Sequence, residues 1–120
     1  MVEKRQRLTH LTDFQNVKQH GQSFSNMFMV LLAANNNLGY SRFAVAAGRA
    51  VGNAVNRNRV KRRLRSCIDE FSDFIEPGWD LIFYARKPLL TSKFDEINLA
   101  MKEILEDAQL MAPIGYGHDA

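Results

Sequence analysis

Residues 42–65 read RFAVAAGRAVGNAVNRNRVKRRLR and join a strand pattern to the start of a basic helix. The run at 40–47, YSRFAVAA, predicts a strand, and a loop that contains glycine follows it. From residue 60 onward, apolar residues recur at helical spacing and form one stripe. Its members are Val60, Leu64, Cys67, Ile68, Phe71 and Ile75. A strand, a loop and a long amphipathic helix that stops at Pro77-Gly78 therefore form the centre of the predicted fold.

Other apolar runs predict the remaining strands of the sheet. Residues 27–34, MFMVLLAA, predict a buried strand, and a short strand at 23–25 precedes it. Asn and Gly at 35–39 tolerate a positive φ and predict a turn. The strands at 27–34 and 40–47 are therefore expected to pair as a hairpin. Residues 80–85, DLIFYA, predict one more strand after the basic helix.

Two further helices are predicted towards the ends of the chain. Thr12 begins a Thr-x-x-Gln capping box, and a helix is expected from there to His20, ended by Gly21. Thr91 or Ser92 can cap a last helix. The residues of that helix predicted to point inward are Phe94, Ile97, Met101, Ile104, Leu105 and Ala108.

The length and composition fit one domain. The chain has 120 residues, of which 46% are hydrophobic and 24% charged. The order αβββαβα, with a single small sheet of about four strands packed with helices, predicts an α+β fold of the split βαβ type over residues 1–120. The tail is expected to fray from about residue 112. One cysteine, no apolar signal segment and no membrane-length apolar run predict a cytoplasmic protein.

Charge is distributed unevenly along the chain. Residues 1–65 hold 12 Lys or Arg and two acids, a net charge of +10, whereas residues 66–120 hold four Lys or Arg and 11 acids, a net charge of −7. Such asymmetry indicates a face that binds a polyanion. A bipolar distribution that only serves solubility is the alternative.

The basic residues gather on one side of the predicted helix. Residues 49–65 include seven Lys or Arg and no acid. At about 100° per residue, four residues fall opposite the apolar stripe: Asn58, Arg59, Arg62 and Arg65. Lys61 and Arg63 flank the stripe, and Arg57 falls near its edge in the first turn. Unpaired arginines repel each other unless a polyanion binds, which favours nucleic acid over a membrane, a protein partner or a solvated face.

The segment before the helix offers further phosphate contacts. Gly48 and Gly52 bracket Arg49, and Asn53 stands at the predicted N-cap. Glycine permits close approach of a ligand to the backbone, and a helix N-terminus offers free N–H groups to phosphate. The alternative is that the two glycines merely shape a loop and Asn53 only caps the helix. Both interpretations can hold together.

Residues 42–65 resemble the signature of the protein subunit of bacterial ribonuclease P. The core of that signature is an Arg-Asn-Arg motif followed by basic residues, and Arg57-Asn58-Arg59 matches it. Gly52–Val55 match the segment before the core, and Lys61-Arg62 with Arg65 match the segment after it. The similarity extends to parts of the predicted first helix and to Ala85-Arg86-Lys87-Pro88, and it thins after about residue 90.

This resemblance implies that a separate RNA is the catalyst, which uses Mg²⁺ to remove the 5′ leader of precursor tRNA. The protein is expected to bind that RNA and the single-stranded leader, and to favour precursor over product. The residues expected at the RNA subunit are Arg49, Asn53, Arg57, Asn58, Arg59, Lys61, Arg62 and Arg65. The residues expected to line a leader cleft between the first helix and the sheet are Phe14, Lys18, Val30 and Leu32. The implied fold is similar to domain 2 of ribosomal protein S5, with a left-handed βαβ crossover.

Three positions depart from the family pattern. Lys18 and Leu32 stand where the family commonly has aromatic residues, and Ala50 replaces one of two usual lysines. Stacking of a base on an aromatic ring contributes about 1–3 kcal/mol. This cleft is therefore expected to stack less and to rely more on charge and aliphatic contact. Ordinary core packing explains Val30 and Leu32 equally well.

The side chains offer little for catalysis by the protein itself. The histidines are scattered at positions 10, 20 and 118, and Cys67 lies on the apolar stripe. Asp69, Glu70 and Asp73 are more typical of a solvated helix end than of a metal site. The alternatives to a ribonuclease P subunit are a generic RNA-binding protein of the ribosomal type and a protein that nicks RNA alone.

Overall fold

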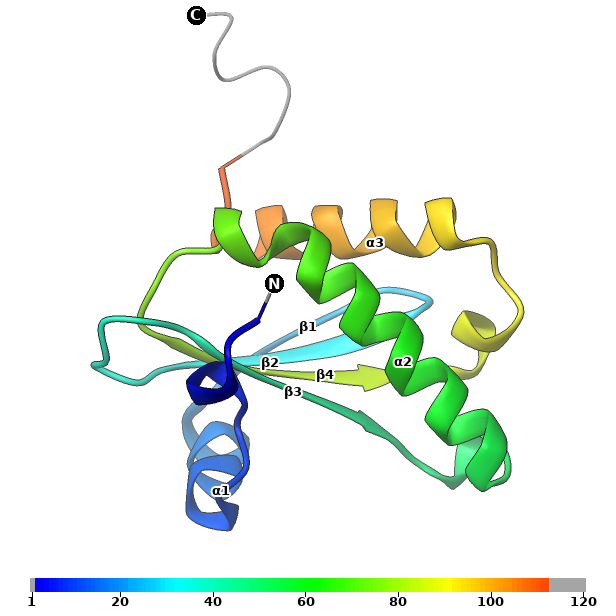
Figure 1. The fold of residues 1–120 in the computed structure, drawn as a ribbon, viewed down its shortest axis with the longest axis horizontal. Coiled ribbons are helices and arrows are strands. Elements are labelled where there is room, and N and C mark those ends of the chain that lie inside the picture. Colours follow the sequence, from blue (N-terminus) through cyan, green and yellow to red (C-terminus); the bar gives the residue numbers. More distant parts are fainter. Residues whose placement is uncertain (1, 113–120) are drawn as a thin grey trace, which may run out of the picture.

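The computed structural model describes residues 2–112, which fold as one four-stranded sheet with helices on both faces (Figure 1). The elements are α1 (Leu11–His20), β1 (Gln22–Ser25), β2 (Met29–Asn35), β3 (Arg42–Ala47), α2 (Ala54–Phe71), β4 (Trp79–Ala85) and α3 (Phe94–Asp107). The short 3-10 helix η1 (Lys4–Gln6) precedes α1, and three others, η2 (Arg49–Val51), η3 (Ser72–Phe74) and η4 (Lys87–Leu90), lie between the later elements. The α+β class and the αβββαβα order are confirmed. The tail beyond residue 112 lies outside the described residues.

The strand order is β1-β2-β4-β3, so the predicted hairpin of β2 and β3 is wrong. β4 lies between them, antiparallel to β2 and parallel to β3. The loop after β2 contacts the segment that enters β4: the N–H of Asn36 donates to the carbonyl of Gly78 at 2.9 Å, and the N–H of Trp79 donates to Ser41 Oγ at 3.0 Å. The polar residues 35–39, which were predicted to form a tight turn, therefore belong to a wider loop, and β4 lies between the two strands that this loop connects.

The connection from β3 through α2 to β4 is left-handed, as the family resemblance predicted. The two strands are parallel neighbours, paired from Arg42↔Asp80 to Ala47↔Ala85. Figure 1 shows both strands running the same way, with α2 crossing on one side of the sheet. Most βαβ crossovers are right-handed. With this left-handed connection, α2 packs across the edge strand β3, and the outer side of α2 is exposed to solvent.

The two faces of the sheet are covered very differently. α2 and α3 lie on one face and α1 on the other (Figure 1). On the face of α2 and α3, the described residues form a core cluster of 22 buried residues, with Phe83, Met29 and Leu31 fully enclosed. The cluster beneath α1 holds four: Leu8, Val17, Ala34 and Ile82. Stability therefore resides mainly on one side of the sheet.

Helix α1 begins one residue before the predicted capping box. His10 is the N-cap, and its carbonyl accepts from the N–H of Phe14 at 3.1 Å, so Thr12 lies inside the first turn and caps nothing. Gly21 ends the helix as predicted. A Cβ at Gly21 would lie 2.4 Å from the carbonyl oxygen of Val17, which explains the need for glycine there.

Helix α3, by contrast, begins later than predicted. Lys93 is its N-cap, and the N–H of Lys93 donates to Glu96 Oε1 at 3.1 Å. Ser92 instead donates its hydroxyl to the carbonyl of Pro88 at 2.7 Å. Phe94, predicted to point inward, is 37% exposed because it is the first residue of the helix. The other predicted inward residues are buried in or packed against the main core.

Helix α2 follows the predicted pattern in most respects. Asn53 is the N-cap and its Oδ1 accepts from the N–H of Asn56 at 2.9 Å. The buried residues of the helix are Val60, Leu64, Cys67 and Ile68. The α-helix ends at Phe71 rather than near Ile75, because the chain tightens into η3 there. No described helix is long and apolar enough to cross a membrane.

Candidate nucleic-acid interface

Helix α2 presents the predicted cationic side to solvent. We call the outward residues of this helix the cationic face: Asn58, Arg59, Arg62, Arg65 and Ser66. All five are exposed, whereas Lys61 and Arg63 are half-buried beside the apolar stripe. No Lys or Arg of α2 forms an ion pair with a carboxylate in the described part of the chain. The basic side chains of this helix therefore carry positive charge that no ion pair with a described carboxylate neutralises.

Arg57 connects the helix to the loop that carries Arg49. Its side chain is half-buried, and its Nη1 donates to the carbonyl of Gly52 at 2.8 Å. Gly52 has a φ of +137°, which other residues rarely adopt. A Cβ there would also lie 2.8 Å from Asn56 Nδ2. The loop-shaping role is thus shown for Gly52, whereas Gly48 has open space around it.

Arg63 is bound to the protein rather than free for a ligand. Its Nη1 donates to the carbonyl of Leu90 at 3.1 Å, and its Nη2 donates to the carbonyl of Ser92. These bonds join α2 to the turn before α3. Arg63 was left out of the predicted RNA-contacting set, and its hydrogen bonds explain a structural role.

The cationic face includes a shallow hollow between α2 and α3. Its volume is about 410 Å³, and Arg59, Arg62, Arg63, Ser66 and Phe94 line it. Arginine binds phosphate with two donors at once, and an exposed aromatic ring can stack on a base. Phe94 was not predicted as a surface residue, because its spacing matched the inward stripe of α3.

The sheet face beneath α1 is only partly covered. Alternation along the strands places Val30, Leu32 and Ala34 of β2 on this face, opposite Tyr84, Ile82 and Asp80 of β4. Val17 of α1 is buried against Ala34 and Ile82, and Phe14 and Leu32 pack at the edge of the same cluster. We call the rest of this face, which consists of the half-buried residues Val30, Ala46 and Tyr84, the open face; Tyr84 also packs against the edge of the small cluster.

The four residues predicted to line the leader cleft lie on α1 and on one face of β2. Phe14 and Lys18 lie one helical turn apart on α1, and Lys18 is exposed. Leu32 and Phe14 both pack against the small cluster beneath α1. Val30 lies beyond that cluster, half-buried on the open face. Core packing thus explains part of the burial of Leu32. Val30 lies outside the cluster and keeps part of its surface accessible.

Three residues of the open face were not predicted. Tyr84 is half-buried opposite Val30, and Arg86 and Lys87 are exposed just beyond the end of β4. Arg86 Nη1 donates to the carbonyl of Asn26 at 3.1 Å, which holds the side chain at this end of the sheet. The alternation of β4 could have identified Tyr84. The central place of β4 in the sheet could not be predicted from its own residues.

A hollow of about 570 Å³ at the edge of β3 connects the two regions. Phe14 of α1 and Arg65 of α2 both line it, together with Arg7 and Ala44. The cationic face and the cleft beside α1 are therefore neighbours across one strand. A single RNA-binding surface can extend over both.

Within residues 2–112, no three or more His, Cys, Asp or Glu residues are grouped so that they could hold a metal ion. Asp69, Glu70 and Asp73 are exposed. Cys67 is fully buried, and burial raises the pKa of its thiol to about 12. At neutral pH the thiol is therefore protonated and a poor nucleophile.

A family model described as Ribonuclease P matches residues 2–109 of this chain. The chain belongs to the ribonuclease P protein family. The ribonuclease P protein component of Herpetosiphon aurantiacus is 34% identical over 109 residues, which cover 91% of this chain and 89% of that protein. The corresponding protein of Clostridium kluyveri is 35% identical over 106 residues, which cover 87% and 95%.

Solved structures of ribonuclease P proteins share the fold. That of Staphylococcus aureus gives a TM-score of 0.79 at 27% identity and covers 88% of this chain and 97% of that chain. That of Thermotoga maritima gives 0.76 at 28% identity and covers 84% and 96%. The chain is thus a protein component of ribonuclease P, an endoribonuclease of tRNA processing in which it acts with an RNA subunit. A generic RNA-binding protein of the ribosomal type is not favoured.

Proposed function

We propose that this protein holds the RNA subunit on the cationic face of α2 and the 5′ leader of precursor tRNA along the open face. The RNA subunit supplies the catalysis. The observation that carries this proposal is the pairing of an unneutralised arginine helix with an uncovered sheet face, joined by the hollow at β3. Folded RNA presents phosphates to an arginine helix, and a single strand suits an extended groove.

The RNA subunit is expected to contact the residues predicted from the sequence. Exposed Arg59, Arg62 and Arg65 can each reach phosphate without breaking a bond within the protein. Arg49 and the N-cap Asn53 are exposed beside the first turn of α2, where the helix dipole also favours an anion. Arg57 contributes by fixing this turn to the loop.

The leader is expected to run past α1 over Val30 and Tyr84 towards Arg86 and Lys87. Besides Phe14 of α1, the structure offers the half-buried aromatic ring of Tyr84 on this route, where Lys18 and Leu32 provide none. Basic residues at the end of the sheet suit the phosphates of a single strand. Affinity for the leader should then depend more on salt than on base identity.

The holoenzyme is expected to require Mg²⁺ bound by RNA. The described part of the protein offers no group of three or more carboxylate, histidine or cysteine side chains that could hold the ion. The contribution of the protein is to neutralise phosphate charge where the RNA subunit and the precursor meet. Such neutralisation should lower the Mg²⁺ concentration at which the complex is active.

Multiple-turnover cleavage of precursor tRNA by a bacterial ribonuclease P RNA at low Mg²⁺ tests this proposal. Addition of the protein should restore cleavage at the mature 5′ end, and the protein alone should leave the precursor intact. Binding to the RNA without restored cleavage would contradict the subunit role. Cleavage by the protein alone would place catalysis in the protein instead.

A further inference from the structure

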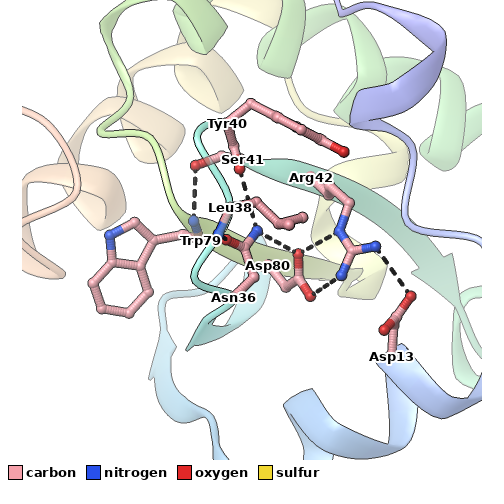
Figure 2. Close-up of polar contacts among 8 residues, drawn as sticks. All are labelled: Asp13, Asn36, Leu38, Tyr40, Ser41, Arg42, Trp79 and Asp80. Carbon is pink, nitrogen blue, oxygen red and sulfur yellow. Dashed lines mark hydrogen bonds and ion pairs between the residues drawn. The ribbon is translucent and has the colours of Figure 1, made fainter.

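A polar network ties α1 to the sheet through Arg42 (Figure 2). Arg42 Nε donates to Asp80 Oδ1 at 2.8 Å and its Nη2 donates to Asp80 Oδ2 at 2.7 Å. The remaining nitrogen, Nη1, donates to Asp13 Oδ2 at 3.1 Å. The side chains of Asp80, Arg42 and Asp13 are 3%, 17% and 29% exposed, respectively. The network therefore runs from the interior of the sheet to the first turn of α1.

Contacts that do not involve α1 hold the Arg42 guanidinium in place. Arg42 and Asp80 are direct neighbours on β3 and β4, and two parallel bonds hold them in one geometry. Asn36 Nδ2 donates to Asp80 Oδ1 at 2.9 Å and to the carbonyl of Tyr40 at 3.2 Å, so the loop after β2 braces the carboxylate. Hydrogen bonding to Asp80 raises the pKa of Arg42. Arg42 is thus a fixed point to which Asp13 can bind.

Helix α1 has few other attachments. It is 10 residues long, and Val17 is its one buried residue. A helix of this length is not stable by its own hydrogen bonds. Its position over the sheet therefore depends on the apolar contacts of Val17 and Phe14 with the small cluster and on the ion pair at Asp13. It also depends on the chain connections of α1 to β1 and to Leu8, whose N–H donates to the carbonyl of Phe43 at 2.9 Å. Phe14, which follows Asp13, packs against the small cluster and lines the hollow at the edge of β3.

We propose that Asp13 and Arg42 are positioning residues of the leader cleft. They act by fixing α1, and with it Phe14 and Lys18, at one distance from the open face. This inference rests on the proposed role of that cleft in binding the 5′ leader. Neither residue needs to contact the leader itself.

The substitution Asp13→Asn distinguishes a positioning role from a purely electrostatic one, because the two roles predict opposite changes in affinity for the leader. Removal of a negative charge beside the cleft should strengthen binding of a polyanion if charge alone matters. If the ion pair positions α1, its loss should instead weaken binding of the leader. The assay is the affinity of the holoenzyme for precursor tRNA with a leader of about ten nucleotides and with a leader of one nucleotide.

Positioning predicts that the affinity gained from the long leader falls about threefold to tenfold in Asp13→Asn. Affinity for the short-leader precursor and for the RNA subunit should stay unchanged. The matched control is Asp73→Asn, which removes the same charge from an exposed position in η3 and should keep the full gain. An unchanged or larger gain in Asp13→Asn would overturn the inference. No gain in the wild-type protein would instead overturn the proposed leader binding.

A distance measurement on the free protein tests the same inference without RNA. Spin labels at Gln19→Cys on α1 and Glu103→Cys on α3, both exposed sites, report the position of α1 in a Cys67→Ala background. The distribution of distances should broaden in Asp13→Asn and stay narrow in Asp73→Asn. Equally narrow distributions in both variants would show that the ion pair does not position α1.

Discussion

The two faces of the sheet differ in what covers them, and the difference separates stability from binding. On one face, α2 and α3 enclose the main core of the described residues, with Phe83 and Leu81 fully buried on β4. On the other, α1 covers one end, and Val30 and Tyr84 at the far end stay half-buried. A small domain can leave half of a sheet face accessible when the opposite face supplies enough buried area.

The largest expected effect is on unfolding. Phe83→Ala should lower the free energy of unfolding by about 3–5 kcal/mol, because a fully buried ring leaves a cavity in a packed core. Tyr84→Ala, the neighbouring residue on the open face, should cost less than half as much, since its ring is already partly hydrated. Urea denaturation followed by circular dichroism measures both. Equal losses would mean that the open face is as structural as the core.

Thiol reactivity is the next sharpest contrast. Burial raises the pKa of Cys67 to about 12, against about 8.5 for a free cysteine, so a far smaller fraction is ionised at pH 8. Native Cys67 should react with a thiol reagent about a thousandfold more slowly than the unfolded chain. Ala46→Cys on the open face, in a Cys67→Ala background, should react readily. Comparable rates at the two positions would erase the contrast between the faces.

The raised pKa of Cys67 also determines how stability changes with pH. The folded state keeps the Cys67 proton more tightly than the unfolded state does, so the contribution of this group to stability is complete below about pH 8.5. It should decline as the pH rises from there towards about 12. Comparison of wild type with Cys67→Ala over this range isolates the effect. A stability difference between the two that does not change with pH would contradict it.

Substitution of an exposed arginine on α2 should give a smaller effect, which falls on binding to the RNA subunit alone. Arg62→Ala should weaken binding to the RNA subunit about fivefold to tenfold and reduce the salt dependence by the share of one phosphate contact, about 0.7–0.9 in slope. The stability of Arg62→Ala should change by less than about 0.5 kcal/mol, because the side chain is exposed and forms no ion pair with any of the residues that the structure describes. Arg57→Ala should lower both the affinity for the RNA subunit and the stability, since Arg57 also donates a hydrogen bond to the carbonyl of Gly52. Equal losses of stability in the two variants would make Arg62 structural.

Features set by neighbouring residues could be predicted from the sequence. The stripe from Val60 to Ile68 and the outward arginines both follow from the helical period, and each is observed on the expected side of α2. The N-cap Asn53 and the end of α1 at Gly21 also depend on residues within one turn. Local periodicity and capping therefore determined the predicted RNA-binding helix.

Features that depend on distant partners could not be predicted in this way. β2 and β3 looked like a hairpin because a turn separates them, yet each pairs with β4 from later in the chain. Arg42 lies 29 residues from Asp13 and 38 from Asp80, and no local pattern joins them. The order of strands and the position of α1 both follow from these long-range contacts.

Site-specific crosslinking to the assembled holoenzyme tests most directly whether the two regions bind different RNAs. A short photoreactive group is attached at Ala46→Cys on the open face or at Ser66→Cys on the cationic face, each in a Cys67→Ala background. The account predicts that the label at residue 46 crosslinks to the 5′ leader of bound precursor tRNA and the label at residue 66 crosslinks to the RNA subunit. Crosslinks from both positions to the RNA subunit alone, or an exchange of the two targets, would contradict the division of roles between the two regions.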